Sequence, residues 1–239
     1  MVLPSTAGAQ KFCDHGPARQ FITIDAHALF GGSAISQNYM GCFPEIREID
    51  SNMGISYGGG FGAEFNIRDY LALGTQINFL INTNRVNLAV SNFNVTSVSN
   101  VFVHNRYYYV NVPVYMSFKF NLAPHLRWNI DGGFYYSYGV GGRQRQNVYT
   151  SSVNQLGQLI NHVTSTRTDY FNNQGTFINR FLRGDLGLYA ATGLTIKRHY
   201  HLGVRAAVGF KNVSTVEPSG ITNPNIHNFN LQMVVGYKF

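Results

Sequence analysis

The residues that could support catalysis are few and widely separated. Asp25 and His27 lie two residues apart, so in an extended strand they share one face and the carboxylate could orient the imidazole. His104, His162 and His227 lie in or beside polar segments and complete no recognised spacing of acid, base and nucleophile. The sequence therefore predicts no catalytic residues and no enzyme activity.

The two cysteines indicate no metal or cofactor site. Cys13 precedes the first expected strand, and Cys42 falls in the first long connection. An oxidising compartment would allow a disulfide, but in the topology derived below the two thiols lie on opposite faces of a membrane. We expect no bond between them. Neither cysteine has metal-ligand spacing, so no metal or cofactor is predicted.

The composition favours a chain that crosses a membrane with strands. Charged residues make up 12% of the sequence, roughly half of the ~25% that is usual for a soluble domain. Aromatic residues reach 14%, and the mean hydropathy is −0.11. No apolar run reaches the ~18 residues of a membrane-spanning helix. A membrane-spanning chain whose apolar residues are dispersed by alternation would explain both the low charge and the absence of a long apolar run.

Eight segments alternate with the period of two that is typical of strands. They are 22–30, 55–67, 71–82, 108–120, 127–140, 182–196, 202–210 and 229–239. A β-sandwich would also separate apolar from polar faces, but several of these segments reach the length of a tilted bilayer crossing. We therefore predict an all-β fold, an eight-stranded antiparallel up-and-down transmembrane β-barrel closed by its first and last strands. Pro113 lacks an N–H, so we expect a local irregularity there, such as a bulge.

The connections alternate in length, which sets the orientation. Short ones fall at 68–70, 121–125 and 197–201, and long ones at 31–53, 82–107, 141–181 and 211–228. Outer-membrane barrels have short periplasmic turns and long extracellular loops, so both termini are expected in the periplasm. The third long loop contains Tyr149, Tyr170, Phe171 and Phe177. These aromatic residues could contact a ligand or pack the loop onto the rim, and packing is the favoured interpretation.

Two sets of side chains should gather near the periplasmic end. A lumen charge network is expected from Asp25, Glu64, Lys119, Arg127, Asp131, Arg205 and Lys238. It could bind or gate ions, but charges in a narrow lumen must be paired, which favours a structural plug. On the lipid side, an aromatic girdle is expected from Phe65, Phe118, Phe120, Trp128, Tyr237 and Phe239.

The N-terminus and the net charge bear on processing and partners. Ala7-Gly8-Ala9 matches a secretory cleavage pattern, so residues 1–9 are interpreted as the end of a signal peptide, 10–19 as a periplasmic segment and 20–239 as the barrel. The net charge is +7, but the basic residues do not cluster in the sequence; the densest groups are 143–145 and 197–201. We expect them to face water or lipid headgroups and predict no nucleic-acid partner.

Three pieces of the sequence resemble the PorT-like outer-membrane β-barrel family of Bacteroidota. They are YVNVPVYMSFKF (109–120), DLGLYAATGLT (185–195) and VVGYKF (234–239), within a resemblance that covers roughly residues 20–239. The resemblance implies a signal peptide, an outer-membrane location and insertion by the barrel-assembly machinery, with the C-terminal aromatic residue as an assembly signal. Some members serve type IX secretion, and the family shares no catalytic residues.

These observations predict an integral outer-membrane protein whose partners are outer-membrane lipid, the barrel-assembly machinery and other envelope proteins. The favoured hypothesis is a non-enzymatic structural or accessory subunit of an envelope complex, linked through the resemblance to type IX secretion. Two alternatives stay open at this point: an outer-membrane enzyme that modifies lipid A or peptides, and a small pore.

Overall fold

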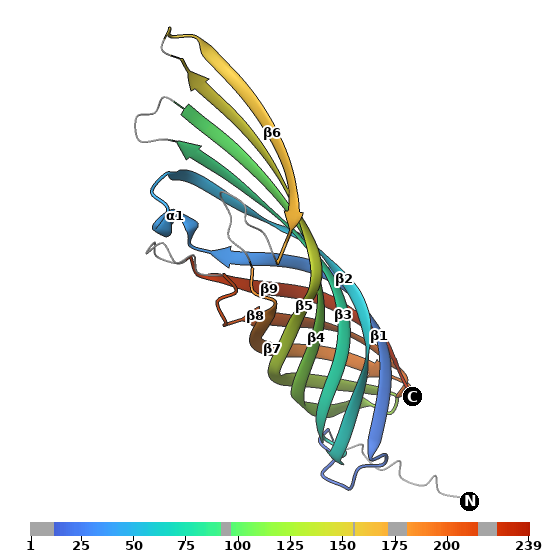
Figure 1. Cartoon of the computed structure of the whole chain (residues 1–239). Coiled ribbons are helices and arrows are strands. Elements are labelled where there is room, and N and C mark those ends of the chain that lie inside the picture. The colour runs from blue at the N-terminus through green and yellow to red at the C-terminus, as the bar shows by residue number, and fades with distance from the viewer. Residues whose placement is uncertain (1–11, 92–96, 155, 172–180, 215–223) are drawn as a thin grey trace, which may run out of the picture.

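The computed structural model shows one antiparallel sheet that closes on itself (Figure 1). It describes residues 12–91, 97–154, 156–171, 181–214 and 224–239. The strands are β1 (Ile22–Gln37), β2 (Ile46–Arg68), β3 (Leu71–Ser91), β4 (Ser97–Ala123), β5 (Leu126–Val153), β6 (Leu159–Asp169), β7 (Gly184–Ile196), β8 (Tyr200–Gly209) and β9 (Ile226–Lys238), and a short helix α1 spans Tyr39–Cys42. No helix within the described residues is long and apolar enough to cross a membrane.

Eight of the strands form the predicted ring. Their order around the ring is β4-β3-β2-β1-β9-β8-β7-β5, and β5 pairs in turn with β4. The first and last strands pair along their length, from Asp25 opposite Lys238 to Gln37 opposite Ile226. Beyond the end of β9, the Phe239 N–H donates to the carbonyl of Ile24 at 2.8 Å. The predicted eight-stranded barrel is thus confirmed.

The barrel buries its polar side chains and exposes its apolar ones. In β1, Ile24 is 53% exposed and Phe30 62% exposed, whereas Asp25 and His27 between them are buried. The same alternation runs through the other barrel strands. Such a surface would be unfavourable in water, but it suits a wall that faces lipid on the outside and a narrow lumen on the inside.

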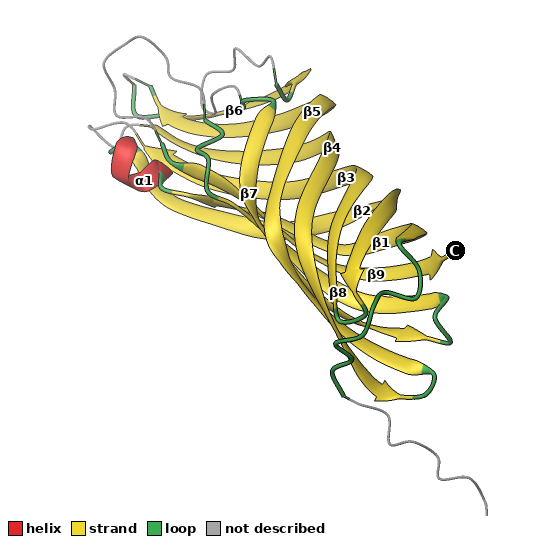
Figure 2. Ribbon diagram, turned by 90° about the horizontal axis from the view of Figure 1, so that it is seen from below, coloured by secondary structure: helices red, strands yellow, loops and turns green. Residues whose placement is uncertain are grey.

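The first three long extracellular loops were predicted too long, because most of their residues belong to strands, whereas only the end of the fourth does. β2 begins at Ile46, β3 runs to Ser91, β4 begins at Ser97 and β5 runs to Val153. β6 lies wholly within the predicted third loop and, among the described strands, pairs with β5. Figures 1 and 2 show these strands extending well past β7 and β8. We call this part, β2–β6 beyond the ring, the extension.

The expected irregularity at Pro113 is confirmed, but it is not a bulge. The β3–β4 ladder lacks pairs between Thr75–Val114 and Asn78–Asn111 without a change of register, and Pro113 stays opposite Tyr135 on the other side. In the β4–β5 pairing a bulge lies at Val140 in β5, because Gly139 pairs with Tyr109 whereas Gly141 pairs with Tyr108. This bulge could not be predicted from the sequence, because Val140 continues the alternation of apolar and other residues that precedes it in β5.

An aromatic stack ties the extension back to the barrel. Tyr170, directly after β6, lies between Tyr107 of β4 and Phe181, with ring centroids at 4.5 and 4.3 Å. Phe171 is also buried and contacts Tyr109. Tyr170 and Phe171 thus pack the third long loop onto the barrel, as predicted. Two others differ: Tyr149 is on the exposed face of β5 against Phe102, and Phe177 lies outside the described residues.

This stack predicts a local stability effect. Tyr170→Ala should remove the central ring, which costs about 3–5 kcal/mol for a buried aromatic side chain. The extension should then be cleaved faster by added protease in detergent micelles, while the barrel keeps its heat-modifiable mobility on gels. Tyr170→Phe, which keeps the stack, is the matched control. Equal cleavage of the alanine variant and the wild type would contradict this packing role.

Candidate functional site

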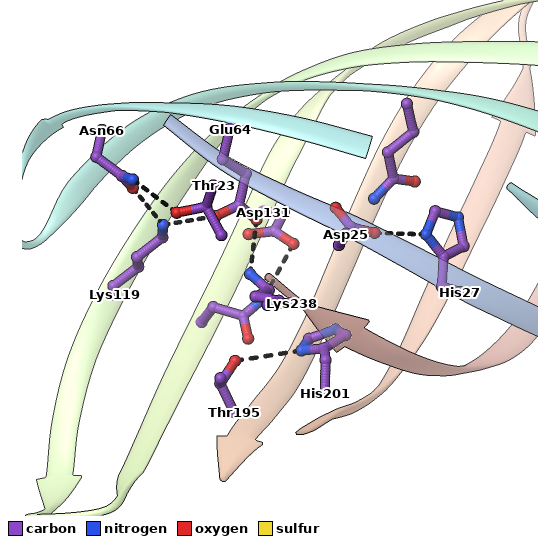
Figure 3. A network of polar contacts seen from close by, with 12 residues as sticks. Thr23, Asp25, His27, Glu64, Asn66, Lys119, Asp131, Thr195, His201 and Lys238 are labelled. Carbon is purple, nitrogen blue, oxygen red and sulfur yellow. Dashed lines mark hydrogen bonds and ion pairs between the residues drawn. The ribbon is translucent and has the colours of Figure 1, made fainter. Parts of the chain in front are cut away.

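A buried carboxylate holds two lysines at the periplasmic end of the lumen (Figure 3). Glu64 Oε2 lies 2.6 Å from Lys119 Nζ, and Glu64 Oε1 lies 2.8 Å from Lys238 Nζ. Lys119 Nζ also donates to Asn66 Oδ1 at 2.7 Å. Both carboxylate oxygens therefore accept charge-assisted hydrogen bonds in a place where an unpaired ion would be costly.

The register of the sheet explains why these groups meet. Glu64 lies opposite Thr23 and Lys238 lies opposite Asp25, so β1 separates the two strands that carry the ion pair. Thr23 is small, and both long side chains point inward past it (Figure 3). Lys119 arrives from β4, across the lumen. The pairing that closes the barrel is therefore also what brings Lys238 to Glu64.

A second buried group lies higher in the lumen. His27 Nδ1 is 2.6 Å from Asp25 Oδ2, and His27 Nε2 is 2.6 Å from Asn78 Oδ1. Glycines in β2 make the space: a Cβ at Gly62 would come within 2.3 Å of Asp25 Oδ1, and one at Gly60 within 2.4 Å of Asn78 Oδ1. Both imidazole nitrogens of His27 therefore have hydrogen-bond partners within the barrel.

The remaining predicted lumen charges have separate partners. Arg127 pairs with Asp69 and donates to Asn121 Oδ1 at 2.8 Å. Arg205 Nε donates to Gln232 Oε1 at 2.7 Å. Asp131 accepts a hydrogen bond from Asn129 at 3.0 Å. The seven predicted residues thus lie in the same part of the lumen but form several local groups instead of one network.

Asp69 is the acid that sequence reasoning missed. It lies in the short turn after β2 and is buried, although turn residues are usually solvated. The position of the turn could have indicated this contact, because residues 68–70 lie at the same end of the barrel as Arg127. Alternation could not reveal the contact, since it assigns faces only within strands.

Tyrosines fill the lumen above the charges. Tyr115, Tyr135 and Tyr189 are buried together, and the rings of Tyr115 and Tyr189 lie 5.4 Å apart. The Tyr135 hydroxyl donates to Asp185 Oδ2 at 3.0 Å, and Asn228 donates to the same oxygen. Above them the interior holds aromatic side chains up to Tyr107 and Tyr170, together with buried polar residues such as Ser33 and Asn84, which bond to the Tyr107 hydroxyl. Side chains thus occupy the interior from the charged end to the aromatic stack.

A cavity of about 290 Å³ lies below the charges, at the periplasmic end. Basic residues outnumber acids in its wall, which includes Arg19, Lys119, Arg127, Arg198, Lys238, Glu64 and Asp69. The space could hold several waters and would attract anions. No group of three or more potential metal-ligating side chains occurs in the described part of the chain.

The predicted girdle residues lie outside the barrel at this same end. Phe120 and Trp128 are 5.6 Å apart, and Tyr237 and Phe239 are 5.1 Å apart. Phe65 and Phe118 are each 41% exposed. Trp128 Nε1 donates to Thr192 Oγ1 at 2.8 Å, so even the indole N–H has a partner. This arrangement suits aromatic rings at a membrane–water boundary.

Comparison with known proteins identifies the family. A family model described as "Outer membrane protein beta-barrel domain" matches residues 18–238. No curated protein matches the sequence.

Solved structures give weaker likenesses. The Yersinia pestis attachment invasion locus protein Ail, solved with the heparin analogue sucrose octasulfate, is 9% identical over 92% of this chain and 100% of its own, with a TM-score of 0.37. Pseudomonas aeruginosa OprG is 8% identical over 95% and 99%, with a TM-score of 0.35. Likenesses this weak carry no argument about binding or activity.

Breaking the buried ion group should destabilise the barrel. Glu64→Gln leaves Lys119 and Lys238 without their counter-ion, and removing one partner of a buried pair costs about 3–5 kcal/mol. The midpoint of urea unfolding in micelles should fall accordingly. Glu48→Gln, which removes an exposed carboxylate from the extension, is the matched control. An unchanged midpoint for Glu64→Gln would show that the ion group is not structural.

Proposed function

The chain belongs to the outer membrane protein β-barrel domain family, and from this premise we propose that it is a non-enzymatic structural or accessory subunit of an envelope complex. It is an integral outer-membrane protein, and in this proposal its short turns face the periplasm. In this proposal the barrel is an anchor, and the extension is the surface that it holds outside the membrane.

The continuity of the strands carries the proposal. β4 and β5 pair from Ala123 opposite Leu126 to Ser97 opposite Ser152. These strands have 27 and 28 residues, whereas a crossing needs about 9–11. More than half of each strand therefore lies outside the hydrocarbon and is joined to the embedded part by strand pairing that shifts register at the Val140 bulge. A surface carried on continuous strands suits docking against a partner.

The lumen supports an anchor over a pore or an enzyme. Eight strands leave an interior that side chains can fill, and Tyr115, Tyr135 and Tyr189 occupy it. The Asp25–His27 pair is buried below the rim with both imidazole nitrogens engaged. These observations favour a structural interior.

We further propose that the complex belongs to type IX secretion. This assignment rests on the resemblance of 109–120, 185–195 and 234–239 to PorT-like proteins. This assignment is more specific than the family match, and identification of the co-purified partner tests it.

Co-purification from native membranes tests the proposal. The full-length protein, extracted in mild detergent, should carry a stoichiometric protein partner. A trimmed variant in which 148–164 is replaced by Asn-Gly should lose that partner, because it lacks the outer part of β5 and most of β6.

Heat-modifiability on gels is the control that the trimmed barrel still folds. Isolation of the full-length protein as a lone monomer would contradict the proposal. Retention of the partner by the trimmed variant would place the docking surface elsewhere.

A further inference from the structure

Basic residues that are far apart in the sequence line up across the extension. Arg85 of β3 lies opposite His104 of β4, His104 opposite Arg145 of β5, and Arg145 opposite Arg167 of β6. Directly opposite residues in an antiparallel sheet point to the same face. All four are exposed. The expectation that basic residues do not cluster was therefore wrong in space, and we call these four residues the basic row.

A second pair of arginines lies next to the row, toward the membrane. Arg106 of β4 lies opposite Arg143 of β5, and both are exposed. The bulge at Val140 makes this possible. It inverts the alternation of β5, so that Arg143 and Arg145 point outward while Gln144 and Gln146 are buried. The five arginines and His104 thus share one face of four strands.

On β3–β6, the five arginines share this face with one carboxylate of the described residues, Asp169. Within the described residues, no ion pair involves any of the five arginines. Asp169 lies opposite Arg143, and its Oδ1 accepts the N–H of Phe171 at 2.8 Å. Asp50, on β2, accepts a hydrogen bond from Asn52. Like charges placed opposite one another destabilise a sheet, so an anion on this face would be stabilising.

The pKa of His104 is lowered in this position. Partial burial, followed by the charges of Arg85 and Arg145, lowers the pKa of its imidazole. The ring is therefore neutral between two arginines at physiological pH. The positive charge of the basic row therefore comes from its three arginines.

The position of this face relative to the membrane identifies the ligand class. Tyr108 and Phe79 stack at 6.3 Å on the lipid-facing side of β4 and β3, at the outer end of the barrel. Arg106 lies over the Tyr108 ring at 5.8 Å. His104 is four residues beyond Tyr108, or roughly 10 Å farther from the hydrocarbon in a tilted strand. Since a headgroup layer is about 5–8 Å thick, Arg106 and Arg143 lie within it, and the basic row lies just beyond it, within reach of the long arginine side chains.

We propose that this face binds the phosphate groups of anionic glycolipid in the outer leaflet. Guanidinium groups bind phosphate oxygens in a bidentate manner, and arginines on adjacent strands could contact neighbouring phosphates. The face continues the lipid-facing wall of the barrel, which favours a membrane lipid over a soluble polyanion. The site is independent of the proposed protein partner.

Binding of purified lipid A to the full-length protein in zwitterionic micelles tests the proposal. Replacing Arg85, Arg145 and Arg167 together by Gln should weaken binding at least about tenfold, since three charge-assisted contacts are lost. Dephosphorylated lipid A should bind the wild type at least about tenfold more weakly than lipid A does. A control variant with Arg68, Lys197 and Lys211 replaced by Gln removes the same charge elsewhere, from exposed positions, and should bind like the wild type.

Three outcomes would overturn the proposal. One is unchanged affinity of the arginine variant, provided that its heat-modifiability shows a folded barrel. Another is equal binding of phosphorylated and dephosphorylated lipid A. The third is tighter binding of heparin than of lipid A with the same dependence on the three arginines, which would assign the face to a soluble polyanion.

Discussion

The need to pair every backbone group inside the hydrocarbon governs this structure. Lipid offers no hydrogen-bond partners, so the sheet must close, and it closes where β1 meets β9. Closure with eight strands makes the lumen narrow and sends alternate side chains into it. Polar groups there are crowded and desolvated, which explains why Glu64 engages two lysines and why Asp25, His27 and Asn78 contact one another. The closing strand supplies Lys238, so the seam and the ion group depend on each other.

Outside the membrane the same strands no longer need to pair every backbone group within the sheet. Water can satisfy the backbone groups of an open edge, so the extension need not close and can end at β6. Its inner face buries apolar residues such as Val86 and Val103 beside polar ones such as Asn105, and the Tyr170 stack holds it to the barrel. Its outer face changes from lipid-facing apolar residues to arginines. One continuous sheet thus presents three chemically distinct surfaces, to lipid, to headgroups and to the extracellular side.

Alternation in the sequence was sufficient to predict the barrel but not what lies beyond it. Apolar positions such as Phe30 and Phe61 mark the lipid face directly, so the eight strands and their closure could be predicted. In the extension, Arg85 and Arg145 replace the apolar outer residues, which makes the strands look like polar loops. The basic row joins positions up to 82 residues apart (85 to 167), and only the register brings them together. The contact of Arg127 with Asp69 depends on the path of a turn, which carries no alternation.

One sheet closes within the membrane and continues, with β6 added, outside it. Cross-strand NOEs from solution NMR of the full-length protein in micelles would show both parts of this sheet. We predict contacts between Ala28 and Val235 at the seam and between Arg145 and Arg167 in the extension. Seam contacts accompanied by random-coil chemical shifts from 143 to 169 would contradict it, because the extension would then be a set of loops.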